Sequence, residues 1–229
     1  MKLENMLFMD PISFSGEIVQ SVHDHVMIII TLIVMSISYV FFMMFCRSSQ
    51  IMGERLFQSS EILETVWTVF PVLILVFAAI PSLHSLYILE EEKNPIISVK
   101  ILGNQWYWTY EFNTGYHINY NSYMIPSSDL GDSDLRNLEV DNNLVLPVGV
   151  ETRAIITSSD VIHSWAIPPL GVKMDAVPGR INQTVFSISM SGLFYGQCSE
   201  ICGSLHSFMP ICVEAIPLKN WLKWLELSS

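Results

Sequence analysis

The sequence predicts a two-helix transmembrane hairpin followed by an all-β domain. Two long runs near the start carry no charge, and after residue 93 the chain changes to short β-rich segments separated by turn residues. The composition agrees, because 51% of the 229 residues are hydrophobic and 14% are charged, whereas about a quarter of a typical soluble domain is charged. We therefore expect a membrane part at residues 1–93 and a second domain at residues 94–229.

The first membrane span is predicted at residues 26–46 and the second at residues 65–87. At about 1.5 Å per residue, each helix is long enough to cross a hydrocarbon core of about 30 Å. Pro71 and Pro81 lie in the second span, where proline is tolerated if neighbouring helices satisfy the freed carbonyl. The alternative, two buried core helices, is weaker because such stretches rarely exceed about 14 residues without a polar face.

The charges that flank the spans predict the orientation. Charged residues recur through the opening 25 residues, so we expect no cleavable signal peptide there. Two spans leave both termini on one side of the membrane. Arg47 and Arg55 in the linker outweigh Lys93 near the outer ends, which favours an inside linker and an outside C-terminal domain.

Eight short segments in the second domain have strand length and aromatic or β-branched residues. They cover residues 96–102, 105–112, 144–147, 152–157, 163–167, 183–190, 193–196 and 211–216. Many strands without intervening helical patterns indicate a β-sandwich or Greek-key barrel. In the tail, Leu218, Trp221, Leu222 and Leu225 stand at helical spacing, which predicts a short amphipathic closing helix.

The charge balance restricts the partners. Acidic residues number 22 against 11 basic ones, giving a net charge of -11. A nucleic-acid backbone requires clustered Lys and Arg, so nucleic acid is excluded as a partner. A cationic partner fits this charge better.

The strongest chemical signal is a group of four potential metal donors, Cys198, Cys202, His206 and Met209, within twelve residues. Thiolate, imidazole and thioether together favour copper over zinc. A mononuclear copper site of this kind needs one cysteine and two histidines, whereas the segment has two cysteines and one histidine. Two thiolates on one loop can bridge two coppers, and each copper then needs its own imidazole.

The second imidazole must come from elsewhere in the chain. His163 is the best candidate among the other five histidines, because it begins a predicted strand of the β domain. Met209 and a backbone carbonyl, for which Glu200 is the best placed, would complete the site. The alternative is a disulfide between Cys198 and Cys202, which explains neither His206 nor Met209.

Four segments carry a resemblance to a known family: 22–25 (VHDH), 103–112 (GNQWYWTYEF), 158–184 and 194–210 (FYGQCSEICGSLHSFMP). The sequence resembles the cytochrome c oxidase subunit II family over essentially its whole length. The resemblance implies a Greek-key, cupredoxin-like barrel with a binuclear copper A centre. It maps the copper ligands onto His163, Cys198, the Glu200 carbonyl, Cys202, His206 and Met209.

The resemblance also implies the activity. Single electrons from reduced cytochrome c would reach the copper pair through Trp106 and continue to the haem/copper oxygen-reducing centre of subunit I, coupled to proton pumping. The absence of a presequence resembles the mitochondrially encoded animal form. The expected location is therefore the mitochondrial inner membrane, with both termini and the copper domain in the intermembrane space. The expected partners are subunit I, other subunits of the complex, cytochrome c and the lipid bilayer.

Further roles are implied for single carboxylates. That of Glu200 would bind Mg2+ shared with subunit I, Asp175 would lie near that junction, and Glu64 would stand at the entrance of a proton path. Without the resemblance, Asp175 is more simply a turn residue and Glu64 an interfacial charge. In the same way, Trp106 alone would be core packing.

The basic surface of cytochrome c would meet acidic residues, among them Glu111, Asp141 and Asp160. Relatives commonly carry several carboxylates after the W-Y-W-x-Y-E stretch, whereas here no acid follows Glu111 until Asp129. Charges at the edge of an interface of this kind affect the rate at which cytochrome c associates more than its affinity.

Two other functions fit the sequence less well. A membrane-tethered copper-delivery protein also pairs C-x3-C with a distant histidine, but such proteins typically have proline after the second cysteine and a thioredoxin-like α/β domain. Here Gly203 follows, and the domain is predicted all-β. A quinol-oxidase subunit that has lost copper does not fit the full ligand set.

Overall fold

The computed structural model of the chain describes residues 9–47, 59–91, 94–113, 115 and 117–228. Arg55 and Lys93, on which the orientation argument partly depends, lie outside the described residues. The chain forms two compact units. One contains residues 19–91, and the other contains the β domain together with the described N-terminal residues up to Ile18.

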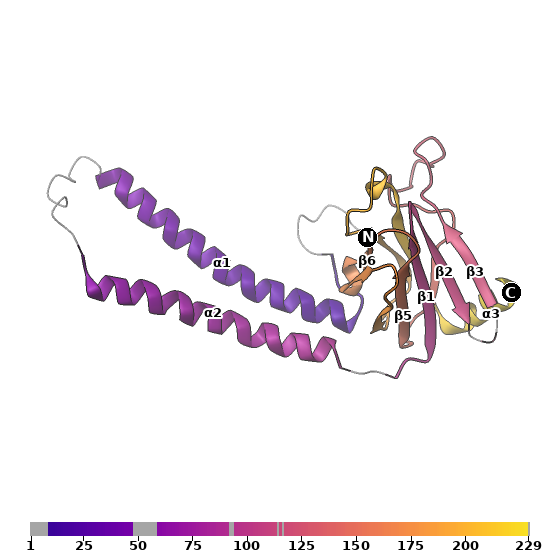
Figure 1. Cartoon of the computed structure of the whole chain (residues 1–229), viewed down its shortest axis with the longest axis horizontal. Helices are drawn as coiled ribbons and strands as arrows, with labels where there is room; N and C mark the ends of the chain where they lie inside the picture. The colour runs from indigo at the N-terminus through magenta and orange to yellow at the C-terminus, as the bar shows by residue number, and fades with distance from the viewer. Residues whose placement is uncertain (1–8, 48–58, 92–93, 114, 116, 229) are drawn as a thin grey trace. The chain divides into compact units, whose positions relative to one another are not determined.

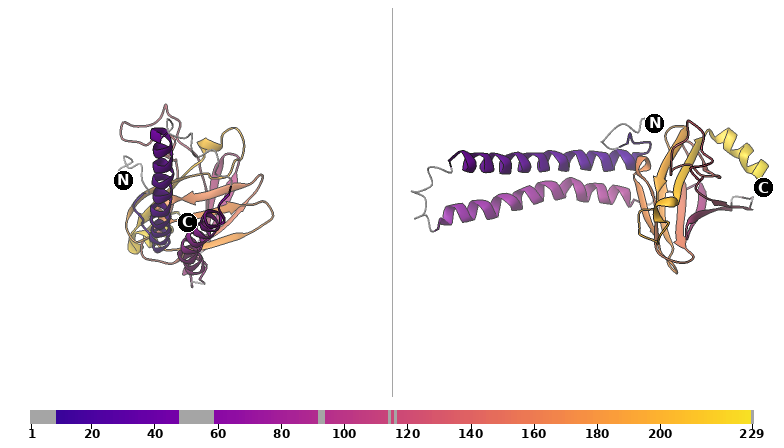
Figure 2. Two further views of the ribbon diagram at one scale, coloured as in Figure 1. Left: turned by 90° about the vertical axis from the view of Figure 1, so that its left-hand side faces the viewer. Right: turned by 90° about the horizontal axis from the view of Figure 1, so that it is seen from above.

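The first unit is a helical hairpin. Helix α1 spans Phe14–Arg47 and α2 spans Glu61–Leu89, and both are apolar and long enough to cross a membrane. The two helices lie side by side (Figures 1 and 2), and Nε2 of His25 lies 3.3 Å from the carbonyl oxygen of Phe77. Helix α2 begins at the cap Ser60, whose hydroxyl accepts from the backbone N–H of Leu63. The predicted hairpin is confirmed, and each helix extends beyond its predicted span.

The second unit is built from ten strands among the described residues (Figure 1). They are β1 (Ile97–Asn104), β2 (Tyr107–Asn113), β3 (His117–Ser122), β4 (Leu144–Pro147), β5 (Thr152–Ser158), β6 (His163–Ile167), β7 (Val172–Ala176), β8 (Asn182–Phe186), β9 (Gly192–Gln197) and β10 (Pro210–Ile216). One sheet has the order β3-β2-β1-β5-β8, a second β4-β10-β9, and β6 pairs with β7. β1 with β5 and β4 with β10 run parallel, and the other pairs are antiparallel. The predicted all-β domain is confirmed.

Buried and partly exposed side chains alternate along the strands, and the buried ones form the hydrophobic core. On β2, Trp108, Tyr110 and Phe112 are all fully buried, while the residues between them are partly exposed. This period of two is the one a half-buried strand requires. Helix α3 (Leu218–Ser228) closes the chain and buries Trp221 and Leu225 against the same core.

Residues near the N-terminus complete the β domain. Ile12 is 3% exposed and belongs to its hydrophobic core. The backbone N–H of Ile12 donates to Pro169 at 2.9 Å, and its carbonyl accepts from the N–H of Ser189 at 2.8 Å. The Ser13 hydroxyl donates to the carbonyl of Leu170 at 2.6 Å. Hydrogen bonds of Ile12 and Ser13 thus fix this segment to the turn after β6 and to the residues that follow β8.

Candidate metal centre

Three segments meet at the ligand cluster. His163 is the first residue of β6, Cys198 follows β9 directly, and the loop after it leads through the 3-10 helix η3 (His206–Phe208) to Met209. The backbone N–H of Ser199 donates to the carbonyl of Ser164 at 3.0 Å, which joins the loop to β6. The crossing of β6 and β9 therefore brings a histidine and a cysteine 35 residues apart into contact.

The two cysteine sulfurs lie at the centre of the cluster. Their Sγ atoms are 4.0 Å apart and both cysteines are free. A disulfide bond is about 2.05 Å long, so the disulfide alternative does not describe this structure. The ligand atoms of His163, Cys198 and Cys202 lie within 4.8 Å of one another, which makes them a group able to hold a metal ion.

Each sulfur faces its own set of further donors. Sγ of Cys198 lies 4.0 Å from Nδ1 of His163 and 3.4 Å from the carbonyl oxygen of Glu200. Sγ of Cys202 lies 3.5 Å from Nδ1 of His206 and 3.5 Å from Sδ of Met209. The structure thus brings all six predicted ligands together, in two sets of three. Their binding of copper stays a prediction.

Burial and mutual charge control the ionisation of the thiols. Burial opposes ionisation of Cys198, but hydrogen bonding with His163 and with the backbone of Ser164 outweighs it and lowers the pKa of this thiol. Burial and the negative charge of Cys198 together raise the pKa of the Cys202 thiol. Cys198 is therefore the more readily ionised of the two.

Asp160 fixes the orientation of the ligand His163. Its Oδ1 accepts from Nε2 of His163 at 2.9 Å and from the N–H of Val161 at 2.6 Å, and its Oδ2 accepts from the N–H of Gln105 at 2.7 Å. Burial alone would raise the pKa of Asp160, but these donors lower it. With Nε2 as the donor, Nδ1 is left unprotonated and faces the thiol of Cys198, as a metal ligand must. Sequence reasoning had assigned Asp160 to docking only.

Two tryptophans pack against the cluster from β2 and the turn before it. Nε1 of Trp108 donates to the carbonyl of Met209 at 3.3 Å, and its ring meets the His163 ring edge-on at 5.9 Å. Trp106 is half-buried, and a Cβ added to Gly203 would lie 3.0 Å from its ring. Trp108 is fully buried, and it contacts two segments that carry ligands, at His163 and at Met209.

Two glycines allow the cluster to form. A Cβ on Gly103 would lie 2.9 Å from Cδ2 of His163, and a Cβ on Gly196 would lie 1.9 Å from the carbonyl oxygen of Ala166. Sequence reasoning missed both, because close approach of remote segments leaves no local pattern.

The remaining predicted residues lie apart from the cluster or have other partners. Glu200 and Asp175 are exposed at their side chains. Glu111 pairs with Lys100 at 2.9 Å, and Asp141 accepts from the backbone N–H of Tyr123 at 2.7 Å. Glu64 lies in the exposed first turn of α2. None of these positions tests the assigned role.

Known proteins resemble the chain in both units. The family model described as cytochrome c oxidase subunit II, transmembrane domain, matches residues 2–85, and that described as its periplasmic domain matches residues 97–216. Cytochrome c oxidase subunit 2 of Drosophila ambigua is 47% identical over 206 residues, which is 90% of this chain and 89% of that protein. The protein of the same name from Drosophila narragansett is 46% identical over the same shares.

Two solved structures resemble the β domain. The periplasmic domain of subunit II of cytochrome oxidase (CoxB) of Bradyrhizobium japonicum is 40% identical, with a TM-score of 0.55, over 59% of this chain and 95% of that one. A mixed disulfide intermediate between thioredoxin-like TlpA and subunit II of cytochrome c oxidase is 38% identical, with a TM-score of 0.54, over 61% and 94%. The domain is thus cupredoxin-like, as expected. The chain therefore belongs to the cytochrome c oxidase subunit II family and is a membrane-embedded subunit of that oxidase.

Proposed function

We propose that this chain accepts single electrons from reduced cytochrome c at a binuclear copper A centre and passes them to the haem/copper oxygen-reducing centre of subunit I, coupled to proton pumping. The observation that carries the proposal is the paired arrangement of donors. Two free thiols 4.0 Å apart each face one imidazole and one weaker donor.

The donor set fits two coppers. Thiolate, imidazole and thioether are the ligands that copper electron-transfer sites use. The sulfur separation of 4.0 Å is within the span of two metal–thiolate bonds of about 2.3 Å each. Held by these residues, a copper pair would supply one-electron storage with little change in bond length, because both metals and both thiolates would share the electron.

The chain's own residues keep the ligands in place during transfer. Cys198, Cys202 and Met209 are buried and His163 is fully so, which excludes water from most of the cluster. Asp160 holds the ring of His163 by a hydrogen bond. A ligand shell that cannot relax keeps the same geometry in both oxidation states, which favours fast transfer.

Trp106 is where we expect electrons from cytochrome c to enter. Its ring packs beside Gly203, the residue after Cys202, and Nε2 of the adjacent Gln105 donates to the carbonyl of Cys202 at 2.8 Å. This short covalent and hydrogen-bonded connection supports the assignment. Glu111 and Asp141 would attract the basic surface of cytochrome c, and the part of Asp160 that remains exposed would add to them.

The other proposed roles involve subunit I and the membrane. The exposed carboxylate of Glu200 would bind Mg2+ with subunit I, with Asp175 nearby, because Mg2+ prefers a few carboxylate oxygens. Glu64 would stand at the entrance of a proton path. We place the chain in the mitochondrial inner membrane with both termini and the β domain in the intermembrane space, as its fly relatives and its two spans suggest.

Copper stoichiometry combined with electron paramagnetic resonance tests the function. The full-length chain in detergent is expected to bind two coppers and to show hyperfine structure from one unpaired electron shared over both nuclei. Addition of reduced cytochrome c should bleach this signal. Cys202→Ser should lose it, whereas Cys212→Ser, at a buried free cysteine outside the ligand set, should keep it. One localised copper, or none, would contradict the proposal and leave copper delivery as the alternative.

Replacing Asp160 by asparagine is expected to weaken copper binding about 10–100-fold, the usual effect of removing a hydrogen-bond partner of a ligating histidine. The amide no longer fixes the proton on Nε2 of His163. Competition with a chelator measures the affinity, and Asp132→Asn, on an exposed loop residue, is the control. Unchanged affinity would show that β6 alone orients the ring.

Copper uptake is expected to release protons, so that the apparent affinity rises with pH. The raised pKa of Cys202 keeps its thiol protonated through the neutral range, and copper must displace that proton. Burial lowers the pKa of His163, but Cys198 and Asp160 raise it above its usual value. At acidic pH the His163 imidazole is therefore a second group, after the Cys202 thiol, from which copper must displace a proton. Chelator competition between about pH 6 and 9 should give the steeper slope at low pH. An affinity independent of pH would contradict the proposed ionisation.

A further inference from the structure

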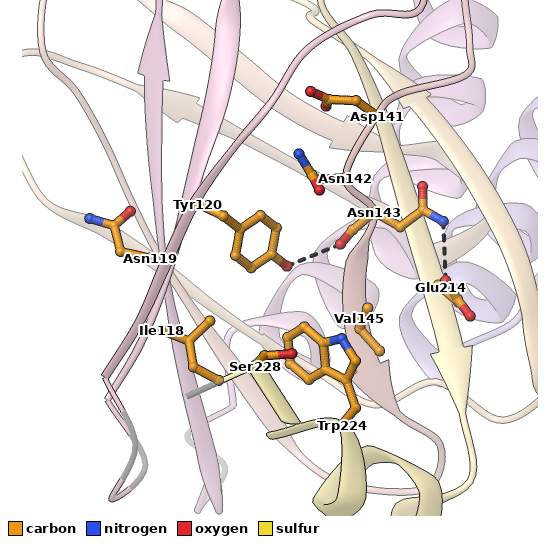
Figure 3. Close-up of a pocket in the computed structure, with 10 residues that line it drawn as sticks. All are labelled: Ile118, Asn119, Tyr120, Asp141, Asn142, Asn143, Val145, Glu214, Trp224 and Ser228. Atoms are coloured by element: carbon orange, nitrogen blue, oxygen red, sulfur yellow. Dashed lines mark hydrogen bonds between the residues drawn. The ribbon is translucent and has the colours of Figure 1, made fainter. Parts of the chain in front are cut away.

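A second site of defined chemistry lies in the β domain, away from the ligand cluster. A cavity of about 420 Å³ opens between β3, the segment before β4, β10 and helix α3 (Figure 3). None of the six predicted copper ligands lines it. Its volume is within the range of small-molecule sites, about 300–1,000 Å³.

The charged residues that line the cavity are all acidic. Asp141 and Glu214 contribute carboxylates, and Asn119, Asn142 and Asn143 contribute amides. The residues that line the cavity include no Lys or Arg. The lining is therefore negatively charged and includes no residue of opposite charge.

The hydrogen bonds of the lining leave several of its acceptors open. Nδ2 of Asn143 donates to Oε2 of Glu214 at 3.1 Å, and the Tyr120 hydroxyl donates to the carbonyl of Asn143 at 3.0 Å. Nδ2 of Asn142 donates to the carbonyl of Asn121 at 3.0 Å, and Oδ1 of Asp141 accepts from the N–H of Tyr123. The other carboxylate oxygens and the Asn142 amide oxygen stay available as acceptors. A ligand that brings donors can therefore bind to these acceptors.

An indole forms one wall of the cavity. Trp221 and Leu225 anchor α3 with 3% exposure each, whereas Trp224 on the same helix is half-buried and lines the cavity. Its ring is held edge-on by Phe112 at 5.8 Å and by Tyr120 at 6.3 Å. Figure 3 shows Tyr120 and Trp224 among the side chains that line the cavity, together with the Asn143–Glu214 hydrogen bond.

We propose that this cavity binds a guanidinium group. A guanidinium is flat and cationic, stacks on an indole face, and presents paired N–H donors that match a carboxylate. The walls offer that combination: Trp224 for stacking, and Glu214 and Asp141 for the charge. The group is either part of a free small molecule or the arginine side chain of a neighbouring protein, since both present the same atoms.

Saturation-transfer NMR with methylguanidinium tests binding to the full-length chain in detergent. Saturable transfer to its methyl group is expected, and methylurea, which has the same shape without the charge, should give none. A ligand this small is expected to bind in the millimolar range. Glu214→Gln should weaken binding about tenfold, as expected for the loss of a charge-assisted hydrogen bond, and Trp224→Leu should weaken it independently. Glu17→Gln, an exposed carboxylate on α1, is the matched control.

The assembled oxidase distinguishes the two sources. If methylguanidinium still binds in the intact complex, the occupant is a free guanidinium compound; if it binds only to the isolated chain, a neighbour's arginine fills the cavity. Equal transfer to methylurea or glucose, or full retention of binding by both cavity variants with normal circular dichroism, would overturn the proposal. So would the absence of saturable binding to the isolated chain.

Discussion

Gly103→Ala is expected to abolish binding of the copper pair although every ligand remains. The added methyl would lie 2.9 Å from Cδ2 and 3.1 Å from Cγ of His163. Neither Gly103 nor His163 can move easily. Gly103 lies in β1 between its sheet partners Trp108 of β2 and Ser158 of β5, and His163 is fully buried. The imidazole must therefore turn away from Cys198. Copper content and the resonance spectrum of the shared electron measure the effect.

Gly131→Ala provides the control for this substitution. A Cβ there would lie 3.3 Å from Oδ2 of Asp134, a flexible side-chain end on an exposed loop. The control should keep both coppers. A Gly103→Ala protein that also kept both, with an unchanged spectrum, would show that His163 is not the ligand of the pair.

Gly196→Ala is expected to destabilise the β domain by about 3 kcal/mol or more, because overpacking against backbone leaves little room for relief. The new Cβ would lie 1.9 Å from the carbonyl oxygen of Ala166. Both atoms belong to strands, β9 and β6, which meet at this point. The strands would have to separate, and the contact between Cys198 and His163 would be lost with them. Urea unfolding of the metal-free chain, followed by tryptophan fluorescence, measures the change.

The metal-free chain is used so that loss of copper does not contribute to the difference in stability. Gly131→Ala should change the free energy of unfolding by less than about 0.5 kcal/mol, as is usual for exposed positions. If Gly196→Ala unfolded at the same urea concentration as this control, the close approach of β6 and β9 would not be a determinant of the fold.

Local patterns in the sequence were sufficient for the hairpin and for most strands. The uncharged runs predicted α1 and α2, and the donor spacing from Cys198 to Met209 predicted one side of the cluster. Strand β3 was missed because its sequence, HINYNS, is mostly polar, and the alternation of Ile118 and Tyr120 with asparagines is too short to predict a strand. Strand β7, VKMDA, was also missed: Asp175, expected in a turn, lies in this strand opposite Ser164 of β6.

The parts of the site that could not be predicted depend on contacts between remote segments. Asp160 accepts from Gln105, 55 residues away, and this bond exists only because β1 and β5 run side by side. Trp108 reaches the carbonyl of Met209 across 101 residues. Such bonds follow from the packing of the whole domain, so an aspartate in a loop and a tryptophan in a strand carry no local sign of them.

The docking of Ile12 and Ser13 onto the β domain has a consequence for how the protein is made. These residues leave the ribosome before their partners Leu170 and Ser189, which follow 157 and 177 residues later. The β domain can thus be completed only when Ile12 and Ser13 lie on the same side of the bilayer as the rest of that domain. The hairpin then ties both of its ends to one domain and shortens the loop that this contact must close, which lowers its entropic cost. Insertion of the hairpin would in this way act as a folding step of the β domain, and a tail retained on the wrong side would leave its core unfinished.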